Sequence, residues 1–235
     1  MEMIGYSTGS LARADVRGAL QLLESRDLGA LELSALRSHE LGPLLQLISE
    51  LSLDRYQQIS VHAPSAFRAG DEPGIAAALL PVACRGWLIV IHPDTIHDHD
   101  LWIPFGDRLA IENMDRRKAV GRTAEELWPV FRKLPEASFC LDLAHAWQCD
   151  PTMSQAARLL AAFGERLAEV HVSELDADSR HIRLTPAGIG AYQRFAEIIP
   201  VHVPVIIEAP VRPDEIESEL EASLVALGRL VPCCA

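Results

Sequence analysis

The sequence lacks the features of a secreted, disulfide-bonded or membrane protein. Its five cysteines are an odd number and include no C-x-x-C pair, so neither a disulfide framework nor a zinc ribbon is indicated. No basic and apolar leader opens the chain, and no apolar stretch is long enough to cross a bilayer. We therefore expect a cytoplasmic protein with reduced thiols and no membrane partner.

Basic residues are also scarce. With 21 Lys and Arg against 33 Asp and Glu, the formal net charge is -12, which disfavours nonspecific attraction to nucleic acid. The compact basic run Arg116-Arg117-Lys118 could bind a substrate phosphate or carboxylate, or could be a solvated loop. A nucleic-acid partner is therefore not expected.

Apolar residues are plentiful, at 49% of 235 residues, which is enough for the core of one large domain over residues 1–235. Strand patterns and helical patterns alternate along the chain with a repeat of roughly thirty residues, and no linker divides them. The sequence therefore predicts an α/β fold, a single (β/α)8 TIM barrel. Residues 94–107 show little helical periodicity, so the crossover after the fourth strand should be reduced or irregular.

Six expected strands end in a residue that can bind a metal. In Phe139–His145, which we expect to be a strand, Phe139, Leu141 and Leu143 alternate with Cys140 and Asp142. A buried charge is costly unless it is compensated, and a metal ion is the usual compensation. The other runs are Ile59–His62, Leu88–His92, Leu109–Glu112, Ala168–His171 and Val205–Glu208. In a (β/α)8 barrel these ends meet at one face, where the chemistry lies.

The helical patterns are less uniform than the strands. Pro43 is expected to open a helix, Thr123-Ala-Glu-Glu126 is a capping box, and Gly164 should stop a helix. We expect helices from Ser10, from Pro43, over Pro73–Cys84, after Thr123, over Thr152–Phe163, over Tyr192–Ile198 and over Asp214–Leu230, with a polar loop over Asp176–Arg183.

Each candidate ligand alone has an ordinary explanation. A single histidine at a strand end is more often a hydrogen-bonded core residue, and Glu112 or Asp142 alone could be a buried ion-pair partner. His, His, Glu, Asp, His and Glu at six strand ends are hard to attribute to coincidence. The joint pattern favours a metal site.

These strand ends resemble the motifs of the xylose isomerase-like superfamily, which contains sugar and sugar-phosphate isomerases and epimerases as well as the endonuclease IV group. The resemblance covers about residues 3–210. It rests on His62-Ala-Pro, Ile91-His92-Pro, Ile111-Glu112-Asn, Leu141-Asp142-Leu-Ala-His145, Val170-His171-Val-Ser-Glu174, Arg180-His181 and Ile207-Glu208-Ala-Pro.

The resemblance implies that Glu112, Asp142, His171 and Glu208 hold one divalent ion. Oxygen ligands with one imidazole suit Mn²⁺, Mg²⁺, Co²⁺ or Zn²⁺. The remaining histidines match positions that hold additional zinc ions in endonuclease IV, so more ligands are present than one site needs. These residues are His62, His92, His145 and His181.

Other features differ from endonuclease IV. That group carries bulky DNA-wedge residues just after its His-Ala-Pro motif, where this chain has Ser65 and Ala66. Its third metal uses an Asp-x-His pair, where this chain has Ser179-Arg180-His181. We therefore expect a third metal site to be empty or weak.

We predict a divalent-metal-dependent isomerase or epimerase of carbohydrate metabolism. Its substrate would be a small sugar or sugar phosphate, and proton transfer would pass through a metal-stabilised enediolate. Glu112 and Glu208 would act as base and acid, and His145, Arg180 and His181 would hold the substrate.

An endonuclease IV-like multinuclear zinc phosphodiesterase (AP endonuclease) is the alternative, with His62, His92 and His145 as further metal ligands. A barrel that binds sugar or metal without turnover is the third possibility. The substrate, the metal and the oligomeric state stay open.

Overall fold

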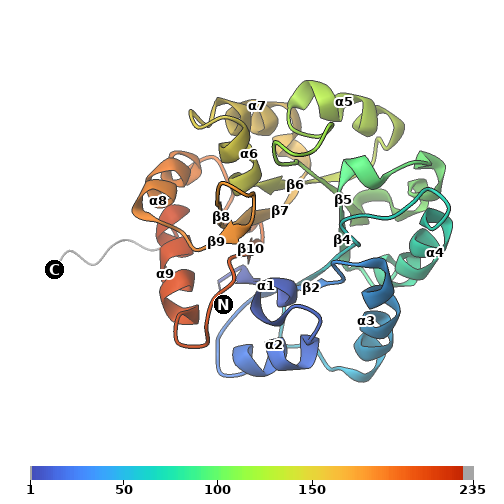
Figure 1. Cartoon of the computed structure of the whole chain (residues 1–235), viewed down its shortest axis with the longest axis horizontal. Coiled ribbons are helices and arrows are strands. Elements are labelled where there is room, and N and C mark those ends of the chain that lie inside the picture. Colours follow the sequence, from blue (N-terminus) through green and yellow to red (C-terminus); the bar gives the residue numbers. More distant parts are fainter. Residues whose placement is uncertain (1, 230–235) are drawn as a thin grey trace.

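The computed structural model describes residues 2–229. Eight parallel strands form a central barrel, in the order β1-β10-β7-β6-β5-β4-β3-β2 (Figure 1). The strands are β1 Ile4–Tyr6, β2 Ala30–Ser34, β3 Gln58–His62, β4 Leu88–Ile91, β5 Leu109–Glu112, β6 Ser138–Asp142, β7 Leu167–Val172 and β10 Val205–Ile207. Strands β3, β4, β5, β7 and β10 end at, or one residue away from, their predicted last residues, whereas β6 ends three residues before its predicted end at His145.

The pairing between β1 and β2, which would close the barrel, is the sparsest of the strand pairings in the barrel. Two parallel bridges join them, Glu2 with Leu28 and Ser7 with Glu32, whereas the other neighbouring strands pair over three or more residues. The barrel is therefore nearly closed, and the predicted (β/α)8 fold is confirmed.

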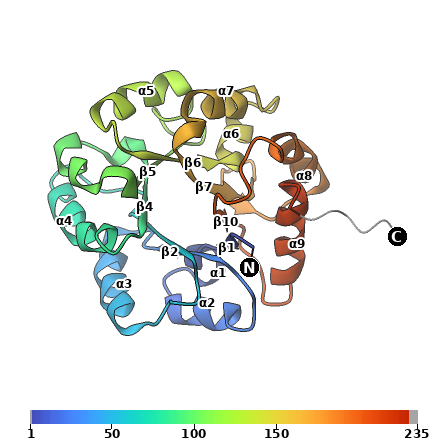
Figure 2. The same ribbon diagram turned by 180° about the vertical axis from the view of Figure 1, so that it is seen from behind.

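Helices surround the barrel on its outer side, as Figures 1 and 2 show from opposite ends. They are α1 Thr8–Ala12, α2 Val16–Leu23, α3 Ser38–Glu50, α4 Glu72–Ala83, α5 Ala124–Lys133, α6 Leu143–Cys149, α7 Ser154–Phe163, α8 Pro186–Tyr192 and α9 Ile216–Ala226. No helix within residues 2–229 has the length and apolarity that a membrane span requires.

Strand alternation separates two apolar layers. Outward-facing residues pack on the helices, as Phe139 does with Phe131 and Phe163. A small second cluster, formed by Leu88, Val90, Ala110 and Cys140, lies apart from this main core. It comes from the alternate positions of β4, β5 and β6, which point into the barrel.

The crossover after β4 is irregular, as predicted. It contains three 3₁₀ helices, Pro93–Thr95, His99–Leu101 and Ile103–Arg108. Glu72, buried at the start of α4, accepts hydrogen bonds from the backbone N–H groups of His97 and Asp98 and from Trp102 Nε1. One carboxylate therefore satisfies three donors of a segment that lacks regular hydrogen bonding.

Several element boundaries differ from prediction. Strand β6 ends at Asp142, and α6 follows at once because Asp142 Oδ1 accepts the N–H of His145 and caps the helix. Helix α3 begins at Ser38, so Pro43 lies inside it. The helix predicted at the N-terminal end is split into α1 and α2.

Near the C-terminal end, the predicted polar loop contains a short antiparallel hairpin, β8 Glu174–Leu175 with β9 His181–Ile182. Helix α8 ends at Tyr192, where the next helix was predicted to begin. Leu230, the last residue of the predicted closing helix, lies outside the described residues, as do Cys233 and Cys234.

Candidate metal centre

Four predicted ligands converge at the C-terminal ends of adjacent barrel strands. Glu112 and Asp142 end β5 and β6, His171 lies near the end of β7, and Glu208 follows β10. One ligand atom from each lies within 4.8 Å of all the others. Consecutive order around the barrel explains how residues almost one hundred positions apart form one cluster.

Asp142 is positioned through its backbone. Its N–H donates to Asn113 Oδ1 at 2.9 Å, and its carbonyl accepts from Asn113 Nδ2 at 2.9 Å. Its Oδ1 caps α6, while its buried Oδ2 has no hydrogen-bond partner within the described residues. That oxygen is free to bind a cation.

The ring of His171 is held by two buried carboxylates. Its Nε2 lies 3.2 Å from Glu169 Oε1 and 3.4 Å from Glu32 Oε2, and all three side chains are fully buried. Its Nδ1 has no hydrogen-bond partner in the described chain and lies 3.5 Å from Glu112 Oε1 and 3.6 Å from Glu208 Oε2. The ring therefore turns Nδ1 toward the carboxylates, which fits a metal ligand whose second nitrogen is oriented by acidic groups.

Glu112 lies among four imidazoles. Its Oε2 is 3.2 Å from Nε2 of both His62 and His92, and its Oε1 is 3.3 Å from His145 Nδ1 and 3.5 Å from His171 Nδ1. Burial alone would raise the pKa of Glu112, but hydrogen bonds from these histidines hold it well below its usual value. Glu112 is thus anionic and belongs to a second group of potential ligands with His62 and His92.

The pKa of Glu208 is shifted in the opposite direction from that of Glu112. Burial raises its pKa to about 8; the charge of His171 opposes this shift, and the nearby carboxylates of Glu32, Glu112 and Asp142 add to it. For His171, burial lowers the pKa, but the surrounding negative charges raise it well above its usual value. Without a cation the cluster therefore retains protons, and a divalent ion would compensate the same charge.

The predicted substrate-binding residues lie around these ligands. His145, in the first turn of α6, has Nδ1 2.9 Å from the Asn113 carbonyl oxygen. His181 Nδ1 is 2.8 Å from Ser173 Oγ and 3.7 Å from Glu208 Oε2. Arg180 is exposed and forms a 3.2 Å ion pair with Asp178.

The position of a third metal lacks its carboxylate. Ser179 Oγ exchanges hydrogen bonds with the side-chain amide of Gln148 and does not pair with His181. Asp178, the nearest carboxylate in sequence, is exposed and pairs with Arg180. That a third site on His181 is empty or weak stays a prediction.

Sequence reasoning missed several polar residues of the centre. Glu32, Glu169 and Asn113 were assigned no role. Glu169 precedes His171 by two residues, so strand alternation puts both on one face and could have revealed it. Asp115, also missed, is buried and receives a bidentate hydrogen bond from Arg117.

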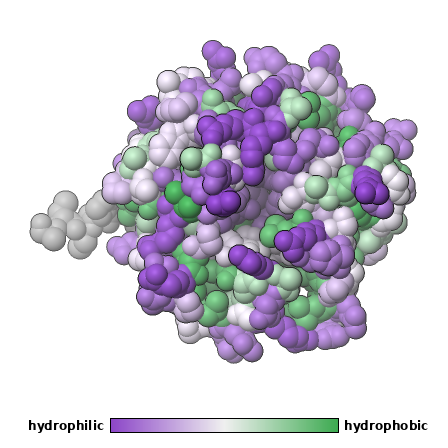
Figure 3. Space-filling model, viewed as in Figure 1, coloured by the Kyte–Doolittle hydropathy of each residue, from purple (hydrophilic) through white to green (hydrophobic). Residues whose placement is uncertain are grey.

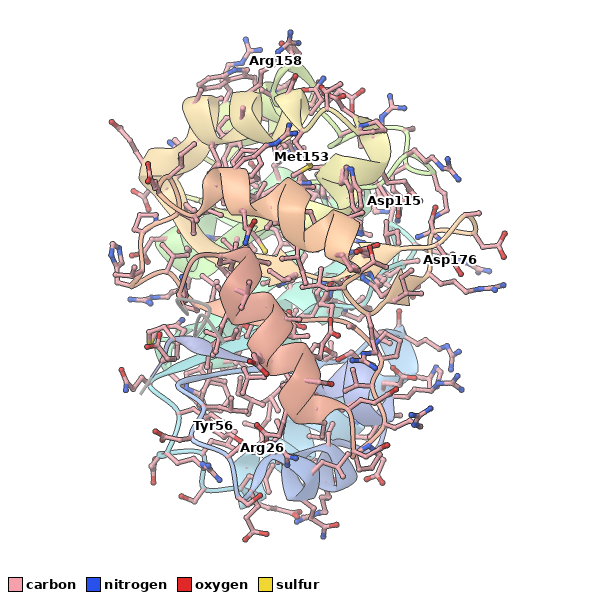
Figure 4. The ribbon with its side chains drawn as sticks, turned by 90° about the vertical axis from the view of Figure 1, so that its left-hand side faces the viewer. Arg26, Tyr56, Asp115, Met153, Arg158 and Asp176 are labelled. Atoms are coloured by element: carbon pink, nitrogen blue, oxygen red, sulfur yellow. The ribbon has the colours of Figure 1, made fainter. Side chains whose placement is uncertain are left out.

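The centre lies at the bottom of an open cavity of about 960 Å³. Its lining includes His62, His92, Glu112, His145 and Glu208. Figure 3 shows hydrophilic residues gathered around the hollow over the barrel axis. In the side view of Figure 4, Asp115 and Asp176 lie on the cavity side, and Tyr56, which precedes β3, lies toward the other end of the barrel.

Fold and site together define a (β/α)8 barrel with a candidate divalent-metal centre at the C-terminal ends of its strands. A solved structure with a similar fold is MenC from Desulfotalea psychrophila LSv54, at a TM-score of 0.50 and 16% sequence identity. The match covers 82% of this chain, which spans half the length of that MenC chain. This likeness shows the fold alone. No family model and no curated protein matches the sequence.

Proposed function

We propose that the protein is a divalent-metal-dependent isomerase or epimerase that acts on a sugar or sugar phosphate. One observation carries the proposal: ligand atoms of Glu112, Asp142, His171 and Glu208 lie within 4.8 Å of one another below an open cavity. Three carboxylates and one imidazole suit Mn²⁺, Mg²⁺, Co²⁺ or Zn²⁺. The unpartnered Asp142 Oδ2 and His171 Nδ1 support this fit.

Such an ion supplies a Lewis acid that lowers the cost of negative charge on a substrate oxygen when a carbon-bound proton leaves. The protein moves that proton. Glu208 lines the cavity beside His181 and retains some exposure, so it can reach a carbon atom of a bound substrate. Glu112, on the other side of His171, is the second proton-transfer group of the proposal.

Substrate oxygens would be held by the polar residues above the ligands. His145 and His181, with ring centres 5.7 Å apart, both line the cavity, and so does Arg180. An imidazole can donate or accept a hydrogen bond, which suits a polyhydroxylated substrate.

The test couples metal analysis with proton exchange. Purified protein is analysed for bound metal, and the metal-loaded protein is then incubated in D₂O with a panel of ketoses and ketose phosphates. We expect deuterium at the carbon beside the carbonyl of at least one sugar. Bound metal without exchange into any sugar would refute the proposal.

A second candidate function is phosphodiester hydrolysis at a two- or three-metal site. It is favoured by the further ligand group His62, His92 and Glu112, which shares Glu112 with the first group. Cleavage of a duplex with an abasic site, together with three ions counted by anomalous scattering, would make hydrolysis the better assignment. The complete ligand set makes a barrel without turnover the weakest of the three readings.

A further inference from the structure

Basic side chains gather at the mouth of the cavity although the chain as a whole is acidic. Five of the residues that line the cavity carry a guanidinium or ammonium group, and four carry a carboxylate. A bound divalent ion would add two further positive charges. The basic residues are Arg13, Arg37, Arg117, Lys118 and Arg180. The cavity lining is therefore less acidic than the chain as a whole.

Four of these five cations already have an acidic partner in the protein. The pairs are Arg37 with Glu40 at 3.6 Å, Arg117 with Asp115 at 2.7 Å, Lys118 with Asp94 at 2.7 Å and Arg180 with Asp178 at 3.2 Å. Arg13 differs, because its side chain forms no ion pair or hydrogen bond within residues 2–229. It remains available to a ligand in the cavity.

The backbone of Arg13 is also unusual. Its φ of 53° and ψ of -121° match the first central position of a type II′ turn, and Asp15 N donates to Ala12 O at 3.0 Å as such a turn requires. Glycine dominates this position because a β-carbon is strained there. Non-glycine residues in such conformations cluster at ligand-binding sites, where the side chain has a use.

We propose that Arg13 binds a phosphate group of the substrate, and that the substrate is therefore a sugar phosphate. A planar guanidinium donates two parallel hydrogen bonds to a phosphate, and Arg13 is the lining cation without an acidic partner within residues 2–229. The cavity is large enough for a molecule that spans from the metal ligands to its rim. Phosphate binding by Arg13 does not depend on the proposed function. Only the sugar part of the substrate rests on that function.

Inorganic phosphate tests the site without turnover. Metal-saturated protein is titrated with phosphate by calorimetry in four forms: wild type, Arg13→Ala, Arg13→Gly and Arg158→Ala. Arg158 is the matched control, because it is an exposed arginine of α7 on the outer surface (Figure 4) and has no ion pair within the described chain. We expect about tenfold weaker binding in both Arg13 variants and unchanged binding in Arg158→Ala.

Arg13→Gly also separates binding from folding. Glycine accepts the positive φ, so this variant should melt about 2–4 °C above wild type while it loses affinity for phosphate. Unchanged phosphate affinity in both Arg13 variants would place the phosphate on the metal and overturn the proposal. Acetate that binds as tightly as phosphate would overturn the choice of phosphate. If both Arg13 variants lose phosphate binding but the wild type exchanges no proton into any sugar, the proposed function is refuted and the phosphate site is retained.

Discussion

At the scale of single residues, the carboxylates of the candidate metal centre repel one another when no cation is bound. Glu208 shows this most clearly, since burial and the charges of Glu32, Glu112 and Asp142 outweigh the attraction of His171. The same carboxylates would bind a divalent ion strongly. Removal of one charge should therefore have opposite effects on the metal-free and the metal-bound protein.

We expect Glu208→Gln and Asp142→Asn to keep the fold and lose metal binding and activity. Wild type should gain about 2.7 kcal/mol of stability at a metal concentration of about 100 times Kd, and the variants should gain almost nothing. Melting curves with and without Mn²⁺ measure this difference. Asp178→Asn, which removes an exposed carboxylate, serves as the control. Normal turnover and metal content in either ligand variant would contradict the assignment.

The pH dependence of the metal-free protein follows from the raised pKa of Glu208. The folded protein holds this proton up to about pH 8, whereas an unfolded chain releases it near pH 4.5. Glu208 therefore costs stability above pH 4.5, and the cost grows until about pH 8. Metal-free Glu208→Gln should be more stable than wild type, by a margin that widens over this range in urea unfolding. A margin independent of pH would show that the carboxyl does not titrate as described.

Metal affinity should rise with pH for the same reason. Glu208 and His171 both have a raised pKa without metal, and both must lose their protons to become ligands. Each released proton contributes about tenfold in apparent affinity per pH unit. Chelator competition between pH 6 and pH 8 checks this, and a flat profile would be the contrary result.

At the scale of elements, the irregular crossover after β4 depends on the single carboxylate of Glu72. Glu72→Ala leaves three donors without their acceptor: the buried Trp102 Nε1 and the partly buried N–H groups of His97 and Asp98. We expect a loss of about 3 kcal/mol in guanidinium unfolding and a red shift of tryptophan fluorescence. Asp71→Ala is the matched control, because Asp71 precedes Glu72, is exposed and makes no side-chain cap. An equal loss of stability in both variants would show that Glu72 has no special role.

The elements also show which parts of the structure could be predicted from the sequence. Period-two alternation identified the barrel strands and thereby the candidate ligands at their ends, because strand geometry is local. The hairpin β8–β9 could not be predicted, since each of its strands has only two residues, which is too short for alternation to identify a strand. The roles of Glu72 and Arg13 depend on contacts or backbone angles that neighbouring residues do not determine.

At the scale of the whole molecule, the charge of -12 limits contact with nucleic acid. We expect at most weak binding to duplex DNA that falls steeply with salt, measured by fluorescence anisotropy at two salt concentrations. The basic run Arg116-Arg117-Lys118 offers little help, since Arg117 and Lys118 pair with Asp115 and Asp94. Submicromolar, damage-specific binding at physiological salt would contradict this and favour the hydrolase.

The order of strands in the barrel also affects how the chain folds during synthesis. Ile4–Tyr6 of β1 pairs with Val205–Ile207 of β10, about two hundred residues later, and meets β2 through two bridges only. While a ribosome extends the chain, β1 must wait for β10, whereas β2 to β7 can pair in the order in which they emerge. Loop closure over this distance is slow, so β1 is exposed to mispairing for longest. Glu208, next to β10, joins the candidate ligands in the same late step, and the nascent barrel cannot assemble the candidate metal centre until its final strand has been synthesised.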